Sequence, residues 1–221
     1  MPRGKTFDPG EKIDEAIDLF WRNGCDAVSI QDIVDALGIN RGSLYATYGD
    51  KEQLWLLALG RYCDVRKARL AELNADQAGP VLPQVRALLS ELTQPADGLP
   101  RGCLVVNAIT ERTADTATRE LALRQIGNVE DTLTTALERA RDTDEIAPGA
   151  SPRQLARFLV VMLQGLHVYN RAVDDPRPVH DAIEVAMSAI SASGQPHPLD
   201  MSGHGSDGNP TGNPRGFPEF T

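Results

Sequence analysis

The sequence is poor in the features that mark disulfide scaffolds, metal sites and membrane proteins. Among its 221 residues, the three cysteines Cys25, Cys63 and Cys103 form an odd and widely spaced set, which argues against a disulfide framework and against the paired ligands of a zinc site. No apolar run approaches the roughly 18 residues that cross a bilayer, and the start MPRGKTFDPGEK does not look like a signal peptide. We therefore predict a cytoplasmic protein with no cofactor, no metal and no membrane contact.

Positive charge is scarce as well. The formal net charge is -9, and residues 1–51 contain six Lys or Arg against nine Asp or Glu, whereas a nucleic-acid binder is usually basic overall. Because the attraction of phosphate acts over about 8 Å at physiological salt, any contact with DNA has to depend on where the positive groups stand.

Helical periodicity dominates the chain. Aromatic residues make up 5% of it and strict apolar alternation is almost absent, so the sequence predicts an all-α protein of about nine helices. Residues 103–109, CLVVNAI, are the one place where a buried strand is conceivable, but no partner strand is visible and we predict a helix there. The later helices are expected near 81–93, 103–113, 115–141, 152–173 and 177–192.

Capping residues define the ends of the early helices. Ser29 with Asp32 three residues later forms a capping box at the start of the second helix. Asn40 is expected to cap a short third helix, and Asp50 a long fourth helix that ends near Leu73. Three short helices thus precede a long one, a layout that suits a small module joined to a larger body.

These patterns divide the chain into three parts. We predict a helix-turn-helix module over 1–51, a larger helical domain for ligand binding and dimerisation over 52–193, and a disordered tail over 194–221. The tail has 13 Gly, Pro or Ser among its 28 residues. Its apolar groups are too few to offset the entropy lost on ordering.

The stretch GINRGSLYATYGDK, residues 38–51, has the composition of a recognition helix. Leu44 and Tyr48 lie one turn apart and form a face that would pack on the preceding helix. The remaining groups point away, and they offer a guanidinium, a close-approach glycine, hydroxyls and an aromatic ring. Such a helix, held across another by a glycine turn, is typical of a helix-turn-helix that enters the major groove.

Residues 11–58 resemble the DNA-binding module of the TetR family of transcriptional regulators. The resemblance is carried by AIDLFWRNG (16–24), SIQDIVDALGI (29–39) and RGSLYATYGDKEQL (41–54). It implies that Tyr45 and Lys51 bind phosphates, Lys51 with help from the positive end of the fourth helix. The family often has a His at the position of Thr47, and that His often contacts a phosphate. The Thr47 hydroxyl is the candidate group for this contact here. The predicted DNA-binding set is Ser29, Gln31, Asn40, Arg41, Gly42, Ser43, Tyr45, Thr47, Tyr48 and Lys51.

Each of these roles has a plainer alternative. Tyr45 suits a half-buried aromatic, Lys51 a solvated neighbour of a helix cap, and Arg41 a contact to the DNA backbone that reads no sequence. Within the expected set, Arg41, Gly42 and Ser43 would face bases.

The segment FLVVMLQGLHVY predicts a subunit interface. Its residues 158–163 are six consecutive apolar residues, so this part of the helix has to be covered all round. In proteins that it resembles, the last two long helices form a four-helix dimer interface. The predicted interface residues are Phe158, Val161, Ile183, Met187 and Ile190; the alternative is that this helix is the centre of a monomeric body.

A pocket for an effector is expected among the fifth to eighth helices. Its candidate residues are polar or soft groups in apolar helical stretches, each of which also suits a core position: Cys103, Asn107, Glu111, Met162, Leu166, His167 and Tyr169. Cys103 stands at a helix start beside Arg101, where the helix dipole and the cation would favour a reactive thiolate; the alternative is an inert buried thiol.

Taken together, the sequence predicts a homodimeric repressor that is released from a palindromic operator by a small-molecule or reactive effector. No nucleophile with a base, pair of carboxylates or phosphate-binding glycine loop is visible, so we expect no enzyme activity. The alternative function is a helical protein-interaction module that no longer binds DNA, which the acidic balance favours.

Overall fold

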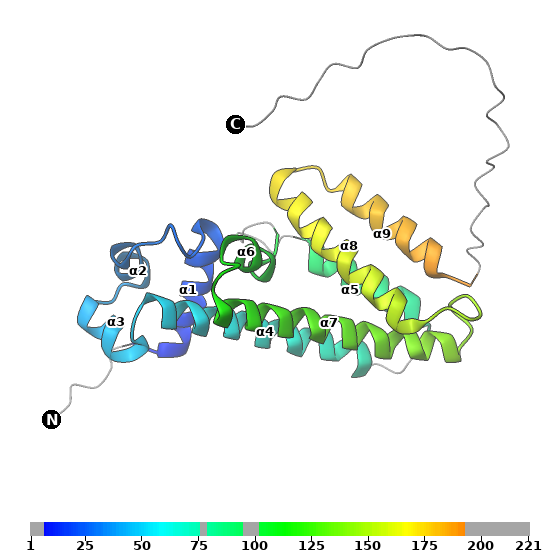
Figure 1. Ribbon diagram of the computed structural model, residues 1–221, viewed down its shortest axis with the longest axis horizontal. Coiled ribbons are helices and arrows are strands. Elements are labelled where there is room, and N and C mark those ends of the chain that lie inside the picture. The colour runs from blue at the N-terminus through cyan, green and yellow to red at the C-terminus, as the bar shows by residue number, and fades with distance from the viewer. Residues whose placement is uncertain (1–6, 76–78, 95–101, 193–221) are drawn as a thin grey trace, which may run out of the picture.

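A computed structural model describes residues 7–75, 79–94 and 102–192, and in these ranges all the named elements are helices (Figure 1). The helices are α1 (Pro9–Asn23), α2 (Ile30–Leu37), α3 (Arg41–Tyr48), α4 (Lys51–Ala75), α5 (Val81–Thr93), α6 (Leu104–Glu111), α7 (Thr116–Asp142), α8 (Pro152–Ala172) and α9 (Arg177–Ile190). The all-α prediction is confirmed, and CLVVNAI is helical from Leu104. None of the helices in these ranges is long and apolar enough to span a membrane. The predicted tail and Arg101 lie outside the described residues.

The predicted caps are present at the starts of α2, α3 and α4. Ser29 Oγ accepts a hydrogen bond from the Asp32 amide at 3.1 Å, and Asp32 Oδ2 accepts one from the Ser29 amide at 2.8 Å. Asn40 Oδ1 accepts from the Ser43 amide at 2.8 Å, and Asp50 Oδ1 accepts from the amide three residues on at 2.8 Å. Local side chains therefore set where these three helices begin.

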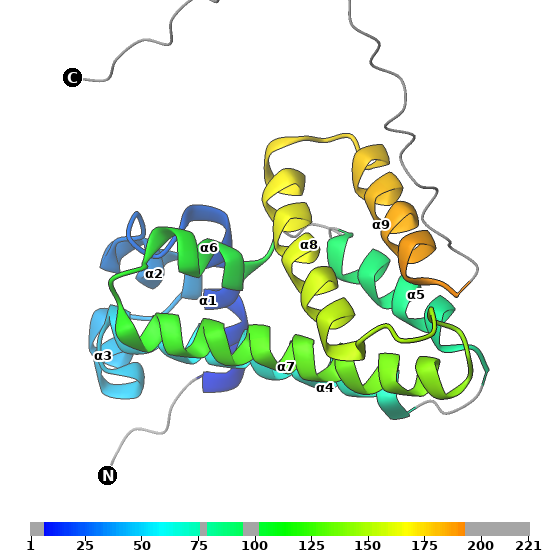
Figure 2. The same ribbon diagram turned by 45° about the vertical axis from the view of Figure 1, so that its right-hand side comes forward.

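Two long helices, α4 and α7, lie side by side and form the spine of the molecule (Figures 1 and 2). Helices α1 to α3 gather at one end of this pair, α6 lies over α7 beside α1, and α5, α8 and α9 pack at the other end. The apolar core has two clusters accordingly. Leu54, Trp55 and Leu59 of α4 belong to the cluster of α1, α2 and α3, whereas Leu70 and Leu73 belong to that of α5, α7, α8 and α9.

Trp55 joins three helices in the first cluster. Its ring, 1% exposed, meets Phe20 of α1 edge-on with centroids 5.4 Å apart. Its Nε1 donates a hydrogen bond to Thr118 Oγ1 of α7 at 2.8 Å. The indole thus fills the space between α1, α4 and α7 and satisfies its one polar atom there.

The structure corrects part of the predicted subunit interface. Ile183, Met187 and Ile190 are only 2 to 3% exposed, and they belong to the core cluster that α9 shares with α5 and α8. The apolar stripe of α9 covers its own subunit because α5 offers a matching face, which periodicity within α9 alone does not reveal. These three residues are therefore core residues, whereas Phe158 and Val161 of α8 are exposed.

The burial of Leu44 makes a prediction about stability. Leu44 anchors α3 and is 0% exposed, so Leu44→Ala is expected to lower the free energy of unfolding by about 2–5 kcal/mol through lost burial and a cavity. Urea unfolding followed by circular dichroism measures this. Leu57→Ala, at a 45% exposed position, is the control and should change it by less than about 0.5 kcal/mol. Equal effects of the two changes would contradict the packing of α3.

Candidate nucleic-acid interface and buried pocket

Helices α2 and α3 form a helix-turn-helix joined by a tight turn. Gly38 ends α2 in the left-handed conformation, with φ of 61°, which glycine adopts without steric cost. Leu37, Ile39 and Leu44 are buried on both sides of the turn. The backbone and apolar groups therefore fix α3 across α2 and leave the other face of α3 in solvent.

Five of the ten predicted DNA-binding residues lie on α3 outside its buried face. Arg41 and Gly42 are exposed, Ser43 and Thr47 are partly buried, and the Tyr45 ring is 51% exposed. Tyr45 thus stands out from the helix rather than packing into the core.

Arg41 is held by a residue that the sequence placed in the same set. Its Nη2 donates a hydrogen bond to Gln31 Oε1 at 3.1 Å, and Gln31 Nε2 in turn donates to Asp35 Oδ1 at 2.8 Å. The guanidinium is therefore oriented by α2, and because Arg41 is exposed it suits contact with phosphate or guanine.

Lys51 lies at the first turn of α4, beside α3. It is partly buried, and its Nζ donates to the backbone oxygen of Asp26 at 3.4 Å. A cation at this place stands next to the N-terminus of α4, and both favour an anion.

Three residues of the predicted DNA-binding set have structural roles in this fold. Tyr48 is 4% exposed and its hydroxyl donates to Pro9 O at 3.0 Å, so it anchors α3 to α1 and is removed from the contact set. Burial also raises the Tyr48 pKa. Ser29 and Asn40 are exposed, but their side-chain oxygens cap α2 and α3.

Gly49 holds the turn after α3 in a conformation that requires glycine. Its φ is 84°, and a Cβ added there would overlap the side-chain amide of Gln53. The turn therefore brings the end of α3 and the start of α4 close together, and Lys51 lies beside α3.

An arginine that sequence reasoning missed pairs with two carboxylates near Lys51. Arg112, at the end of α6, pairs with Glu52 Oε2 at 2.6 Å and with Asp26 Oδ1 at 3.5 Å. It also donates to Cys25 Sγ at 2.7 Å. Because Arg112 is far away in the sequence, no local pattern indicates it, yet it neutralises carboxylates near Lys51.

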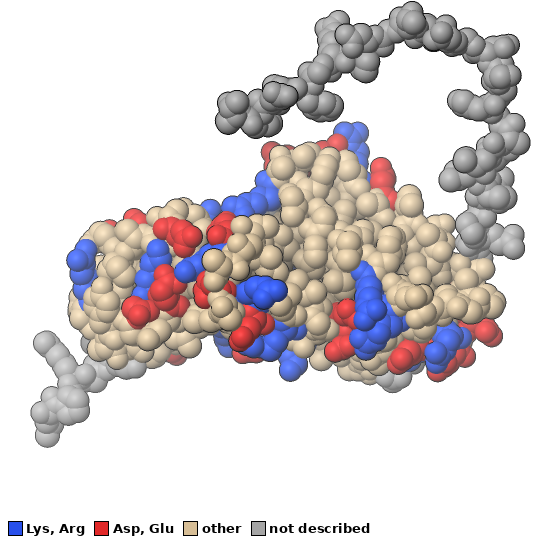
Figure 3. All heavy atoms as spheres, viewed as in Figure 1, with Lys and Arg blue, Asp and Glu red and all other residues tan. Residues whose placement is uncertain are grey.

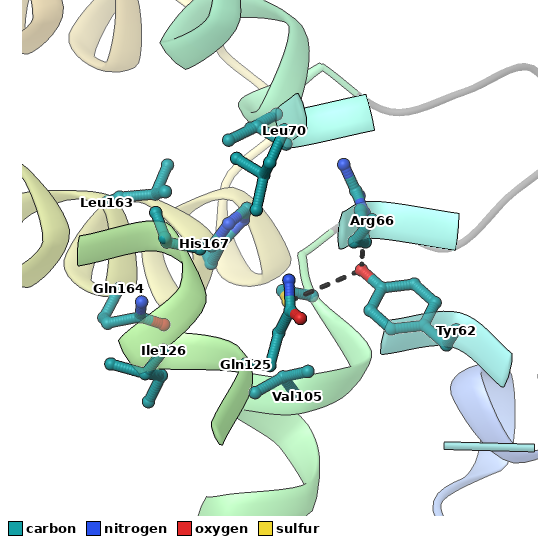
Figure 4. Close-up of a pocket in the computed structure, with 12 residues that line it drawn as sticks. Tyr62, Arg66, Leu70, Val105, Gln125, Ile126, Leu163, Gln164 and His167 are labelled. Carbon is teal, nitrogen blue, oxygen red and sulfur yellow. Dashed lines mark hydrogen bonds between the residues drawn. The ribbon is translucent and has the colours of Figure 1, made fainter. Parts of the chain in front are cut away.

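A pocket opens between α4, α6, α7 and α8, with about 420 Å³ of empty space that is partly open to solvent (Figure 4). Of the seven residues predicted for it, only Cys103 and His167 line it. Polar groups that the sequence did not single out complete it: Tyr62, Arg66, Gln125 and Gln164.

The other five predicted pocket residues lie elsewhere. Asn107 is buried in α6, and Glu111 pairs with Arg171 at 3.4 Å. Leu166 belongs to the body core with Met162 packed against it, and Tyr169 is 39% exposed. Which of these residues face the pocket depends on how each helix is rotated about its own axis. The sequence alone does not give that rotation.

Apolar side chains remain exposed along one stripe of α8. Phe158, Val161 and Val168 are 48%, 72% and 55% exposed at positions three and seven residues apart, and Val185 of α9 is 69% exposed. Figure 3 shows few charged groups over the part of this face where α8 and α9 lie. A stripe of this kind on a long helix is typical of a surface that a partner covers.

Comparison with known proteins supports the same interpretation. Residues 13–58 match the family model of bacterial regulatory proteins of the tetR family, and residues 81–186 match that of the tetracyclin repressor-like C-terminal domain. The chain is 29% identical over 196 residues to the uncharacterized HTH-type transcriptional regulator YezE of Bacillus subtilis, covering 86% of this chain and 100% of that protein. It is 30% identical over 173 residues to the transcriptional repressor ComR of Escherichia coli, covering 76% and 82%.

A solved structure gives the same picture. A cysteine mutant of the TetR family regulator CifR, complexed with 26bp double-strand operator DNA, aligns with a TM-score of 0.74 and 28% identity. The alignment covers 85% of this chain and 99% of that one. The similarity therefore extends over both the module and the body.

Proposed function

Because this chain belongs to the TetR family of DNA-binding transcriptional regulators, we propose that it is a homodimeric cytoplasmic repressor of a palindromic operator. A small-molecule or reactive effector releases it from the DNA. The observation that carries the proposal is the solvent-exposed face of α3, with Arg41 and Tyr45 outward and Lys51 beside them. We assign no catalytic activity to it.

The geometry supports separate roles for the residues of this face, some in phosphate contacts and others in base contacts. Tyr45 and Lys51 bind phosphates on either side of α3, because they lie at its exposed face and at the start of α4. Arg41 and Ser43, near the N-terminus of α3, reach base edges, and Gly42 between them allows the backbone to approach. These contacts are made by residues of the proposed DNA-binding domain, 1–51.

Dimerisation supplies the second recognition helix. A helix of eight residues makes few contacts by itself, and two copies about 34 Å apart reach successive major grooves. The exposed stripe of Phe158, Val161 and Val168 on α8 is the surface that we assign to the partner subunit. The proposed effector and dimerisation domain thus occupies residues 52–193.

A reactive effector would act through Cys103. This thiol is partly exposed at the pocket and accepts a hydrogen bond from the Tyr62 hydroxyl, with 3.5 Å between oxygen and sulfur. Cys25 and Cys63 are buried, and burial raises their pKa to about 11 and about 12. Thiolate is the reacting form, so these two are inert near pH 7.

The first prediction of the proposed function separates phosphate from base contacts. Lys51→Ala is expected to weaken binding about equally on all sequences and to reduce the salt dependence by about one charge, whereas Arg41→Ala should cost about 1–3 kcal/mol and relax the preference at one base position. Fluorescence anisotropy on operators selected from random DNA, at several salt concentrations, measures both. Lys67→Ala, on the exposed surface of α4, is the control for loss of charge.

Two results would count against these assignments. An equal loss on every sequence with Arg41→Ala would make Arg41 a contact to the DNA backbone. If selection enriches no sequence and no fragment binds even at low salt, the chain is a helical protein-interaction module instead, as its net charge of -9 would favour.

The second prediction concerns the dimer. Val161→Asp places a charge on the exposed stripe of α8 and is expected to shift the protein to monomers and to weaken operator binding. Val65→Asp, at a 55% exposed position of α4, should change neither. Analytical ultracentrifugation gives the mass. A wild-type protein that stays monomeric at high concentration would rule out the dimer.

The third prediction concerns the thiols. Treatment with a limiting amount of N-ethylmaleimide should label Cys103 ahead of Cys25 and Cys63, as peptide mass spectrometry would show, and should release the protein from its operator. The Cys103→Ser protein should stay bound after the same treatment. Release of that variant, or first labelling of a buried cysteine, would exclude Cys103 as the sensor.

A further inference from the structure

We propose that the pocket between α4, α6, α7 and α8 binds a small organic monocarboxylate, whose carboxylate lies against Arg66 and whose apolar part lies against leucine and isoleucine side chains. The inference rests on the proposed function in one respect, because it names the chemical class of the effector for which that function calls. It is drawn from the charges and unpaired polar atoms of the pocket.

Arg66 brings a positive charge to the pocket without a carboxylate of its own. Its Nε donates to the Tyr62 hydroxyl at 3.1 Å, and its guanidinium lies 5.3 Å from the centre of the Tyr62 ring. The carboxylate that influences it, Glu91, is already held by both Nε and Nη2 of Arg69 at 2.6 Å. Within the described ranges no ion pair to Arg66 is found, so its outer N–H groups are available for an anion.

His167 supplies an unpaired polar atom in the same pocket. The side chain is 5% exposed, and its Nδ1 is buried with no hydrogen-bond partner. Burial, together with the charge of Arg66, lowers the His167 pKa to about 4, so the imidazole is neutral near pH 7. A buried polar nitrogen without a partner costs free energy, and a ligand oxygen that accepts from the imidazole N–H would remove that cost.

The remaining lining residues indicate the charge of the ligand. Among the described lining residues there is no Asp or Glu, which disfavours a cation, and a neutral ligand would leave the guanidinium without an ion-pair partner. Figure 4 shows Arg66 and Tyr62 on one side of the pocket and Gln164 and Ile126 on the other, with His167 and Gln125 between them. One guanidinium calls for a single carboxylate, and the leucine and isoleucine side chains of the lining call for an apolar part.

Tyr62 connects the pocket to the DNA-binding module. Its ring meets Trp21 of α1 edge-on, with centroids 5.3 Å apart, while its hydroxyl stands between Arg66 and Cys103. A carboxylate that pairs with the outer N–H groups of Arg66 would pull on the same guanidinium whose Nε donates to this hydroxyl. Ligand binding would therefore act on a side chain that packs directly on α1.

The test is a calorimetric titration of the full-length, DNA-free protein with benzoate and butyrate and with their neutral amides, benzamide and butyramide. The acids are expected to bind about tenfold or more tightly than the amides, because only the acids pair with Arg66. Arg66→Gln should reduce acid binding about tenfold and leave the weak amide binding unchanged. Lys67→Gln, which removes the same charge from the exposed side of α4, should bind the acids as the wild type does.

The outcomes distinguish this inference from the proposed function. If the amides bind the wild-type protein as well as the acids do, or if neither acid binds at millimolar concentration, the assignment of an anion is wrong, whether or not Arg66→Gln folds. Operator binding is measured separately without added acid. A protein that binds its operator but prefers no acid keeps the function and loses this inference, whereas one that binds acids but no operator keeps the inference alone.

Discussion

The burial of Trp55 is the interaction on which the arrangement of this molecule depends. An indole of this size, packed against Phe20 and hydrogen-bonded to Thr118, ties α1 and α7 to the same turn of α4. Helix α3 has only eight residues and little intrinsic stability. Its direction comes from the core that Trp55 closes, through the buried Leu44 and Leu54 on either side of the turn at Gly49. A short helix can present charged and hydroxyl groups to a large ligand only if something behind it is rigid, and here the rigid element is α4.

Charge shows why composition is a poor guide to this surface. The chain is acidic, but Asp26 and Glu52, which stand near Lys51, are paired with Arg112 from α6. What a phosphate would meet is the local set of Arg41, Lys51 and the helix N-terminus, because more distant charges are screened. The same pairing makes α6 part of the proposed DNA face in an electrostatic sense, although it lies outside the helix-turn-helix.

How much the sequence predicts follows from the range of the interactions. Helix starts depend on side chains three residues away, so Ser29, Asn40 and Asp50 could be identified as caps from the sequence alone. Rotation of a helix about its axis depends on what its neighbours offer. The sequence therefore predicts a partner subunit against Ile183 and Met187, whereas both belong to the core cluster that includes α5. For the same reason the sequence does not indicate that Tyr62 and Arg66 line the pocket. Tyr48 fell between the two cases, because its spacing from Leu44 indicated burial while the resemblance placed it among the contact residues.

In the proposed regulator, helix α4 is the element that would let the pocket influence the DNA-binding module. Lys51 begins it and Arg66 lies fifteen residues further on, about 22 Å along a continuous helix at 1.5 Å per residue. Trp55 stands between them and is fixed to α1 and α7, so under the proposed function a displacement at Arg66 would tilt α4 rather than stay local. A closely packed core has few intermediate arrangements, and a tilt of α4 moves α3 with it, because both belong to one apolar cluster. In the proposed dimer the two subunits would have to hold their recognition helices at one spacing, so a coupling of about 1–3 kcal/mol between pocket and α3 would change operator affinity about 5- to 150-fold.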